Sequence, residues 1–384
     1  MIEPEQFGNF ANRSSSKWRR FPGDVLPMHV AEMDFEVALP IREKLQEMVA
    51  NSDLGYLGPL PEVGPAFERF ALDRWGWQID PSQIKMATDV GVAAVEILRA
   101  VTQPGDRILI NTPVYSSFFG WISEVGCEIA DAPLTLAGSR WQLDLAAIEQ
   151  QMRDGVKVYM LCSPQNPVGT VHTAKELAEV ARLAKEYGVL VISDEIHAPL
   201  SWVPFTPYLM VSEAAEQTGV TITSSSKAWN TAGLKAGFAI TQSEAVRVKL
   251  KRLPEAMQWR SSILGAFSMV AAYDHGEDWL DETVATLQEN LAHLHHEVAT
   301  QLPKAKVFDM ESTYLAWIDL HDYRVQNPQQ VILDEGKVSV VPGKDHGGEK
   351  YQGYIRLNFA TSKIRITEAV RRIALALEGD KQIL

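Results

Sequence analysis

A lysine that follows a short run of serines is the first candidate for chemistry in this sequence. The run Ser224-Ser225-Ser226-Lys227 comes at the end of an apolar stretch, 220–224, with the composition of a buried strand. A lysine at the end of a buried strand loses solvation, so its amine gives up its proton more easily, as a lysine that forms a Schiff base must. Taken alone, Lys227 is more simply a surface lysine in a serine-rich loop.

Acidic and histidine side chains follow a second apolar stretch. Asp194-Glu195-Ile196-His197 comes directly after the sequence Val-Leu-Val-Ile-Ser at 189–193. A carboxylate at the end of so apolar a strand carries a desolvation cost unless it has a partner. The protonated ring nitrogen of a cofactor is such a partner. His197 could reach a group nearby, or it could be a hydrogen-bonded histidine of the core.

Two further motifs have both a simple and a functional interpretation. Asn166-Pro167-Val168-Gly169 has the composition of a turn, and the Asn166 amide could also point at a cofactor oxygen. Asp89-Val90-Gly91-Val92 opens a predicted helix at about 91–103. Backbone N–H groups and the helix dipole suit a phosphate there, whereas a simple N-cap at Asp89 is the alternative.

The elements that must position these motifs alternate between strands and helices. Apolar stretches, several of them continuous Val/Ile/Leu runs, predict the strands, and a capping box at Thr173 and Glu176 predicts the start of one intervening helix. This alternation predicts a mostly parallel sheet with helices on both faces. Ligands bind at the carboxyl ends of the strands in such sheets, so we expect the four motifs to meet there. The predicted strands are 84–88, 107–111, 127–132, 156–162, 189–193, 220–224 and 236–240.

The pattern changes near residue 277. One long helix is predicted over 277–302, followed by short strands at 306–309, 314–319, 338–341 and 354–358 and a last helix at 367–379. A helix starting at Pro40, with an apolar face of Ile41, Leu45, Met48 and Val49, is expected to pack with this C-terminal part. We therefore predict a large domain over 50–275 and a smaller α+β domain built from 1–49 and 276–384.

Composition narrows the class of protein further. The 384 residues are 46% hydrophobic and 22% charged, as in soluble globular proteins. The two cysteines, Cys127 and Cys162, exclude a disulfide scaffold, and we expect both to be buried rather than catalytic. A net charge of -13 opposes binding to nucleic acid. We also expect no signal peptide, no membrane span and no metal, and therefore a cytoplasmic protein.

Together the motifs resemble those of fold-type-I pyridoxal 5'-phosphate enzymes in the class I/II aminotransferase group. The likeness covers nearly the whole chain and adds Tyr115, the sequence Gly233-Leu234-Lys235, and Arg356 in the sequence Ile-Arg-Leu-Asn. It implies an α/β fold with a mostly parallel seven-stranded sheet and a smaller α+β domain. It also implies pyridoxal 5'-phosphate as cofactor and a homodimer with shared active sites.

The resemblance assigns roles residue by residue. Lys227 is the catalytic residue and forms the Schiff base, Asp194 pairs with the pyridine nitrogen, and Tyr115 stacks on the ring. Asn166 and His197 lie at the phenolic oxygen. The residues assigned to the phosphate are Gly91, Val92, Ser224, Lys235 and, from the neighbouring subunit, Tyr56. The residues assigned to the substrate are Arg356, which clamps the α-carboxylate, Tyr115 and Ala31.

A narrower likeness points to the carbon–sulfur lyase branch, the cystathionine β-lyases of the maltose-regulator type. Its marks are Ser16-Lys17-Trp18 and the stretch from Leu26 to Phe35, in which His29 replaces the usual Trp and Glu32 the usual Asp. The branch implies elimination from cystathionine or another cysteine S-conjugate to a thiol, pyruvate and ammonia. An aminotransferase is the alternative, and a regulatory protein that keeps the fold is the third possibility.

Overall fold

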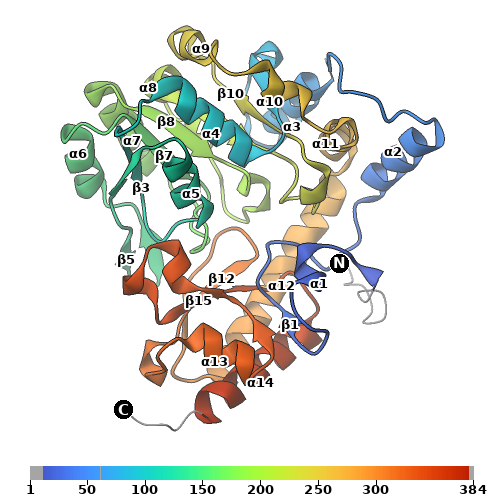
Figure 1. Ribbon diagram of the computed structural model, residues 1–384, viewed down its shortest axis with the longest axis vertical. Helices are drawn as coiled ribbons and strands as arrows, with labels where there is room; N and C mark the ends of the chain where they lie inside the picture. The colour runs from blue at the N-terminus through green and yellow to red at the C-terminus, as the bar shows by residue number, and fades with distance from the viewer. Residues whose placement is uncertain (1–11, 61, 380–384) are drawn as a thin grey trace.

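A seven-stranded sheet forms the centre of the larger part of the molecule (Figure 1). The computed structural model describes residues 12–60 and 62–379. The strand order is β2-β10-β9-β8-β7-β3-β4, and only β10 runs antiparallel to its neighbours. All seven predicted strands occur in this sheet, with ends shifted by no more than about two residues, so the predicted α/β fold is confirmed. The strands are β2 Ile84–Ala87, β3 Arg107–Ile110, β4 Glu128–Asp131, β7 Val158–Cys162, β8 Leu190–Asp194, β9 Gly219–Thr223 and β10 Gly237–Ile240.

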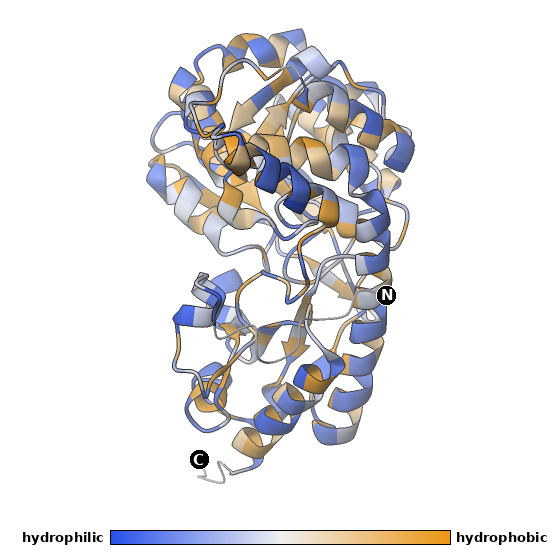
Figure 2. Cartoon of the chain, turned by 90° about the vertical axis from the view of Figure 1, so that its right-hand side faces the viewer, coloured by the Kyte–Doolittle hydropathy of each residue, from blue (hydrophilic) through white to orange (hydrophobic). Residues whose placement is uncertain are grey.

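Helices cover both faces of the sheet because side chains alternate along each strand. Ile108 and Ile110 of β3 enter one hydrophobic cluster, whereas Leu109 between them enters the other. Figure 2 shows the apolar strands inside and the polar faces of the helices outside. The helices around this sheet are α3 Val63–Trp75, α4 Val90–Val101, α5 Ser117–Glu124, α6 Leu145–Arg153, α7 Ala174–Tyr187, α8 Glu213–Thr218, α9 Glu244–Leu250, α10 Glu255–Trp259 and α11 Ile263–His275. The capping box predicted at Thr173 and Glu176 opens α7.

The C-terminal part is a second, smaller layer of helices on a sheet. The long helix α12 (Glu277–Gln301) runs from the large sheet into this part and packs on α14 (Lys363–Gly379) (Figure 1). The predicted strand at 338–341 is divided between two sheets, and α14 begins four residues before the predicted start at 367. The four-stranded sheet consists of β11 Lys306–Val307, β12 Leu315–Asp319, β15 Tyr354–Asn358 and β14 Val341–Pro342, with α13 Pro328–Asp334 beside it.

The N-terminal elements pack in two directions. The strand β1 (Leu26–Pro27) pairs in parallel with β13 (Val338–Ser339), so this stretch joins the C-terminal part. Helix α2 (Leu39–Ala50) instead packs on α11, so our expectation that it packs with the C-terminal part is wrong. Ile41 and Met48 are buried as predicted, but Val49 is 58% exposed and is not part of the apolar face. Val49 follows Met48 directly, and one helical step turns it away from the buried side.

Short elements complete the chain. They are α1 Ser16–Arg19, the hairpin of β5 Thr135–Ala137 and β6 Arg140–Gln142, and single 3₁₀ turns at Pro81–Gln83, Ala198–Leu200, Tyr208–Met210, Ala232–Leu234, His321–Tyr323, Gly343–His346 and Glu349–Tyr351. Across the described ranges, no helix combines the length and the apolar character needed to span a bilayer. Both cysteines are free and buried, as expected.

Candidate active site

A cavity of about 540 Å³ opens where the carboxyl ends of β7, β8 and β9 meet the N-terminus of α4 and the strand β15. This is the edge at which the sequence motifs were expected to converge. Nine of the twelve residues assigned to the cofactor or the substrate line this cavity: Ala31, Gly91, Tyr115, Asn166, Asp194, His197, Lys227, Lys235 and Arg356. Three others, Val92, Ser224 and Tyr56, do not line it.

Lys227 lies beyond the end of β9 and points its amine across the cavity. Its Nζ donates to the carbonyl oxygen of Ala31 at 3.3 Å. The backbone after the lysine is anchored by Trp229, which is fully buried and donates its indole N–H to Gly276. Burial and the neighbouring Arg356 lower the pKa of Lys227 to about 8. A substantial share of these amines is therefore neutral, and able to act as a nucleophile or base, near physiological pH.

Asp194 is the last residue of the apolar strand β8 and is 4% exposed. Its Oδ1 accepts the N–H of Ile196 at 3.2 Å. Burial raises the pKa of Asp194 to about 7, while the nearby Lys227 acts in the opposite direction. A buried carboxylate of this kind gains stability from a cationic group brought into the cavity.

Glu195 has a different role from Asp194, the residue before it. Its carboxyl accepts the backbone N–H of Tyr208 at 2.8 Å and the hydroxyl of Ser193 at 2.9 Å. Burial raises its pKa to about 7 as well. Glu195 does not line the cavity, so we interpret it as a residue that fixes the loop after β8 and thereby the direction of Asp194.

Arg356, a residue of β15, contributes a buried cation to the wall of the cavity. Its guanidinium donates to Oδ1 of Asn166 at 3.3 Å and to the carbonyl oxygen of His29 at 3.2 Å, and its Nε is buried with no hydrogen-bond partner among the described residues. Within those residues it forms no ion pair, and burial lowers its pKa to about 10. A buried guanidinium without a carboxylate is suited to bind a carboxylate from a ligand. The contact to Asn166 uses Oδ1, which leaves Nδ2 as a donor.

Two rings complete the cavity. His197 is 3% exposed, and its Nδ1 is buried with no partner among the described residues. Burial, together with Lys227, lowers its pKa to about 3, so the imidazole is neutral. Tyr115 is partly buried and meets the indole of Trp121 edge-on, with 5.9 Å between the ring centroids. His197 is thus a buried residue that lines the cavity, and within the described part of the chain its Nδ1 lacks the hydrogen bond that the interpretation as a core histidine expected.

The N-terminus of α4 forms one end of the cavity. A Cβ on Gly91 would lie 2.9 Å from the indole of Trp121, so a glycine is needed there. Asp89 caps the helix by accepting the N–H of Val92 at 2.9 Å, which confirms the simpler interpretation of this residue. Its other oxygen, Oδ2, accepts Nζ of Lys235 at 3.0 Å.

Of the three expected residues outside the cavity, two form hydrogen bonds within the chain and one lies on the surface. The N–H of Val92 donates to Asp89, and the hydroxyl of Ser224 donates to the carbonyl oxygen of Ala236 at 2.6 Å. Tyr56 is 96% exposed and lies in a separate surface pocket with Trp259. A residue that acts on a neighbouring subunit would be exposed in this way in a single chain.

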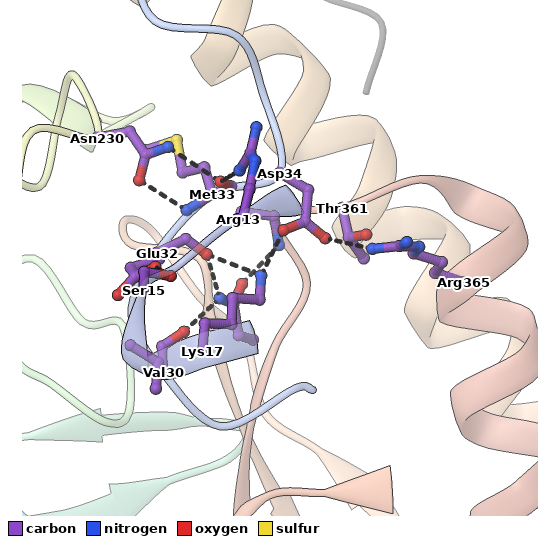
Figure 3. A network of polar contacts seen from close by, with 12 residues as sticks. Arg13, Ser15, Lys17, Val30, Glu32, Met33, Asp34, Asn230, Thr361 and Arg365 are labelled. Carbon is purple, nitrogen blue, oxygen red and sulfur yellow. Dashed lines mark hydrogen bonds and ion pairs between the residues drawn. The ribbon is translucent and has the colours of Figure 1, made fainter. Parts of the chain in front are cut away.

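A crossing segment, residues 29–34, passes over the cavity. Ala31 is the one residue of this segment that was assigned to the site from the sequence, whereas His29 and Glu32 were noted as departures from the lyase branch. Its carbonyl groups accept hydrogen bonds from both parts of the molecule. The carbonyl oxygen of Ala31 accepts from Lys227 and from the hydroxyl of Tyr314, the latter at 3.0 Å. Met33 exchanges two hydrogen bonds of 2.8 and 2.9 Å with Asn230 (Figure 3). Asn358 donates to the carbonyl oxygens of Val30 and Glu32.

A buried charge cluster anchors the end of this segment. Asp34 is 1% exposed and accepts Nζ of Lys17 at 2.7 Å and the guanidinium of Arg365 at 3.0 Å (Figure 3). Lys17 also donates to the carbonyl oxygen of Glu32 at 3.0 Å. The apolar period of α14 gave no signal for Arg365, because a buried arginine on an amphipathic helix has no distinct pattern.

Comparison with known proteins places this site in a family. Residues 24–373 match the family model described as Aminotransferase class I and II. The chain belongs to this family. This class I/II chain is 34% identical to the cystathionine beta-lyase of Corynebacterium glutamicum over 95% of its length and 97% of that protein. It is 32% identical to the cystathionine beta-lyase PatB of Bacillus subtilis, covering 92% of this chain and 93% of PatB.

A solved structure extends the comparison to the fold. The structure of cystalysin from Treponema denticola, which contains a pyridoxal 5'-phosphate cofactor, superposes with a TM-score of 0.93. It is 25% identical and covers 99% of this chain and 100% of that chain. The family and the fold type expected from the sequence motifs are therefore confirmed.

Proposed function

We propose that this chain is a pyridoxal-phosphate-dependent carbon–sulfur β-lyase that cleaves cystathionine or a related cysteine S-conjugate. The products are a thiol, pyruvate and ammonia. One observation carries the proposal, namely the lysine with a lowered pKa that shares a cavity with a buried carboxyl and a buried, unpaired arginine. The relatives named cystathionine beta-lyase support the choice of reaction.

The residues present fit the cofactor. Lys227 has the pKa needed for an imine link to the aldehyde, and Asp194 gains the cationic partner that its burial calls for, the protonated pyridine nitrogen. Nδ2 of Asn166 is a donor for the phenolic oxygen, and Lys235 with the N-terminus of α4 suits the phosphate. When bound, pyridoxal phosphate withdraws electrons from the substrate and stabilises the negative charge that develops at Cα.

The chain itself contributes binding and proton transfer. Arg356 binds the α-carboxylate of the substrate through its planar fork and so fixes the position of Cα. The Lys227 amine removes the Cα proton, and its lowered pKa places it near the optimum for a base at neutral pH. The crossing segment covers Lys227 with the carbonyl group of Ala31 and so limits the access of water.

The decisive experiment combines borohydride reduction with mass spectrometry. Reduction of the purified holoprotein should fix the cofactor on the peptide that contains Lys227. Lys227→Ala should remove both this adduct and the visible absorbance, whereas Lys251→Ala, a change of an exposed lysine outside the cavity, should keep both. An adduct on another peptide would refute the site.

The substrate assay separates the lyase from the aminotransferase. Pyruvate released from cystathionine without any 2-oxo-acid acceptor is the expected result. Strict dependence on an acceptor would identify an aminotransferase, which shares the removal of the Cα proton but returns a proton to the cofactor. A protein that binds the cofactor and turns over neither way would support the regulatory alternative.

We further propose that the protein is a cytoplasmic homodimer of two-domain subunits that binds no nucleic acid. Tyr56 and its exposed apolar neighbours Leu54 and Trp259, which are 55% and 48% exposed, form a surface suited to a second copy. Tyr56 would then complete the phosphate site of the partner. Sedimentation of the holoprotein should give a dimer, and a fully active monomer would contradict this.

A further inference from the structure

An ion pair occupies the end of the cavity that is suited to a phosphate. Asp89 contacts two groups at once, the N–H of Val92 through Oδ1 at 2.9 Å and Nζ of Lys235 through Oδ2 at 3.0 Å. The side chains of the pair are 35% and 56% exposed, and both residues line the cavity together with Gly91. The acidic side chain therefore engages two of the donor groups that a phosphate at this end would use, the N–H of Val92 and Nζ of Lys235.

A carboxylate in this position opposes a bound phosphate in two ways. It occupies the cation and the helix N–H that would otherwise neutralise the ligand. It also places a negative charge beside a dianion, and like charges within a few ångströms repel. A serine or threonine would cap α4 equally well without a charge, so the capping role alone does not require Asp89.

We propose that Asp89 sets the affinity of this site for phosphorylated ligands by competing with the phosphate of the cofactor for Lys235 and for the N-terminus of α4. The proposal rests on the proposed function, because it takes pyridoxal 5'-phosphate as the ligand. Binding then requires Lys235 to exchange its carboxylate partner for the phosphate, so the cofactor is held less tightly and exchanges more readily than on a site without this competitor.

The substitution Asp89→Asn separates the effect of the negative charge from the effect of the helix cap. The amide oxygen still accepts the N–H of Val92, so the helix cap remains, while Lys235 loses its competing anion. We expect Asp89→Asn to lower the Kd for pyridoxal 5'-phosphate about three- to tenfold at low salt, the range expected for a half-exposed charge pair. The gain should shrink at about 0.5 M salt, because exposed charges are screened. Pyridoxal, which lacks the phosphate, should bind both proteins equally.

The assay is a titration of apoprotein with each ligand, followed by visible absorbance and by quenching of tryptophan fluorescence. Asp144→Asn is a matched control, because Asp144 caps α6 through the N–H of Ala147 at 3.0 Å and lies outside the cavity. It should leave both Kd values unchanged. Asp89→Asn combined with Lys235→Met should show a smaller gain than Asp89→Asn alone, because the contested cation is then absent.

Several results would overturn the proposal. An unchanged or higher Kd for pyridoxal 5'-phosphate in Asp89→Asn would show that the carboxylate helps to organise the site. An equal gain for pyridoxal would show that the effect does not involve the phosphate, and an undiminished gain in the Lys235→Met background would exclude competition for that lysine. If the unchanged protein bound no cofactor and gave no adduct at Lys227, the proposed function itself would fail.

Discussion

Replacing Asp194 by Asn should make the cofactor-free protein more stable and weaken its hold on the cofactor. Asp194 is 4% exposed, and burial raises the pKa of its carboxyl to about 7. Asn has nearly the same volume and keeps an oxygen that accepts the N–H of Ile196. The substitution therefore removes one buried charge, together with its attraction to the nearby amine of Lys227.

The direction and the size of this change in the free energy of unfolding follow from proton linkage. Between about pH 4 and pH 7 the folded protein retains a proton on Asp194 that the unfolded chain has released, so the free energy of unfolding falls as the pH rises. Above this window both states are ionised, and the loss is constant. A change in pKa from 3.8 to about 7 corresponds to roughly 4 kcal/mol. Because Asn does not titrate, the advantage of Asp194→Asn should grow by roughly 2–3 kcal/mol between about pH 5 and pH 8.

Urea unfolding of the apoprotein at several pH values measures this difference, at one protein concentration because assembly affects apparent stability. Asp144→Asn, which removes a carboxylate outside the cavity, should show no such growth. Saturating pyridoxal phosphate should reverse the order, because the cofactor nitrogen then pairs with Asp194 in the unchanged protein only. An advantage of Asp194→Asn that is equal at both ends of the pH range would refute the reasoning.

Three further changes test other contacts. Arg356→Met should raise the pKa of Lys227 above 8, because a neighbouring cation is removed, and the pH profile of cofactor binding should shift to higher pH. The same change should raise KM at least about tenfold. An unshifted pH profile would contradict this reasoning. Lys17→Met should lower the free energy of unfolding, measured with urea, by about 3 kcal/mol, because Asp34 loses one of its two buried partners. A loss under about 1 kcal/mol would show that Arg365 alone is enough to stabilise the buried Asp34 carboxylate. Tyr56→Phe should raise the Kd for pyridoxal phosphate several-fold without changing the sedimentation of the dimer, and an unchanged Kd would remove Tyr56 from the site.

The sequence predicted the large sheet well because its strands are coded locally. Continuous Val/Ile/Leu stretches mark strands buried on both faces, and the motifs at their carboxyl ends had to converge once the strands were parallel. Lys227, Asp194 and Asn166 thus line one cavity from three successive strands of the sheet.

Contacts between distant segments could not be predicted in this way. The crossing segment contacts Lys227, Arg356 and Asn358 through carbonyl groups, which every residue has, so these contacts leave no signature in the sequence. The ion pair of Asp89 and Lys235 joins residues 146 positions apart, and neither an N-cap nor a lysine after a turn indicates the other. The direction in which α2 packs was mispredicted for the same reason, because an apolar face does not specify its partner.

The crossing segment leaves room for the substrate preference of this scaffold to diverge. The hydrogen bonds of residues 29–33 to Lys227, Arg356, Asn358 and Asn230 use main-chain atoms, so exchanging the side chains of His29 and Glu32 removes none of them. It removes instead the side-chain hydrogen bonds of His29 to Ser339 and of Glu32 to Ser15. His29 is one of the residues that line the cavity, and burial keeps its imidazole neutral. A library restricted to positions 29 and 32 would therefore be a compact starting point for redirecting the enzyme to other leaving groups.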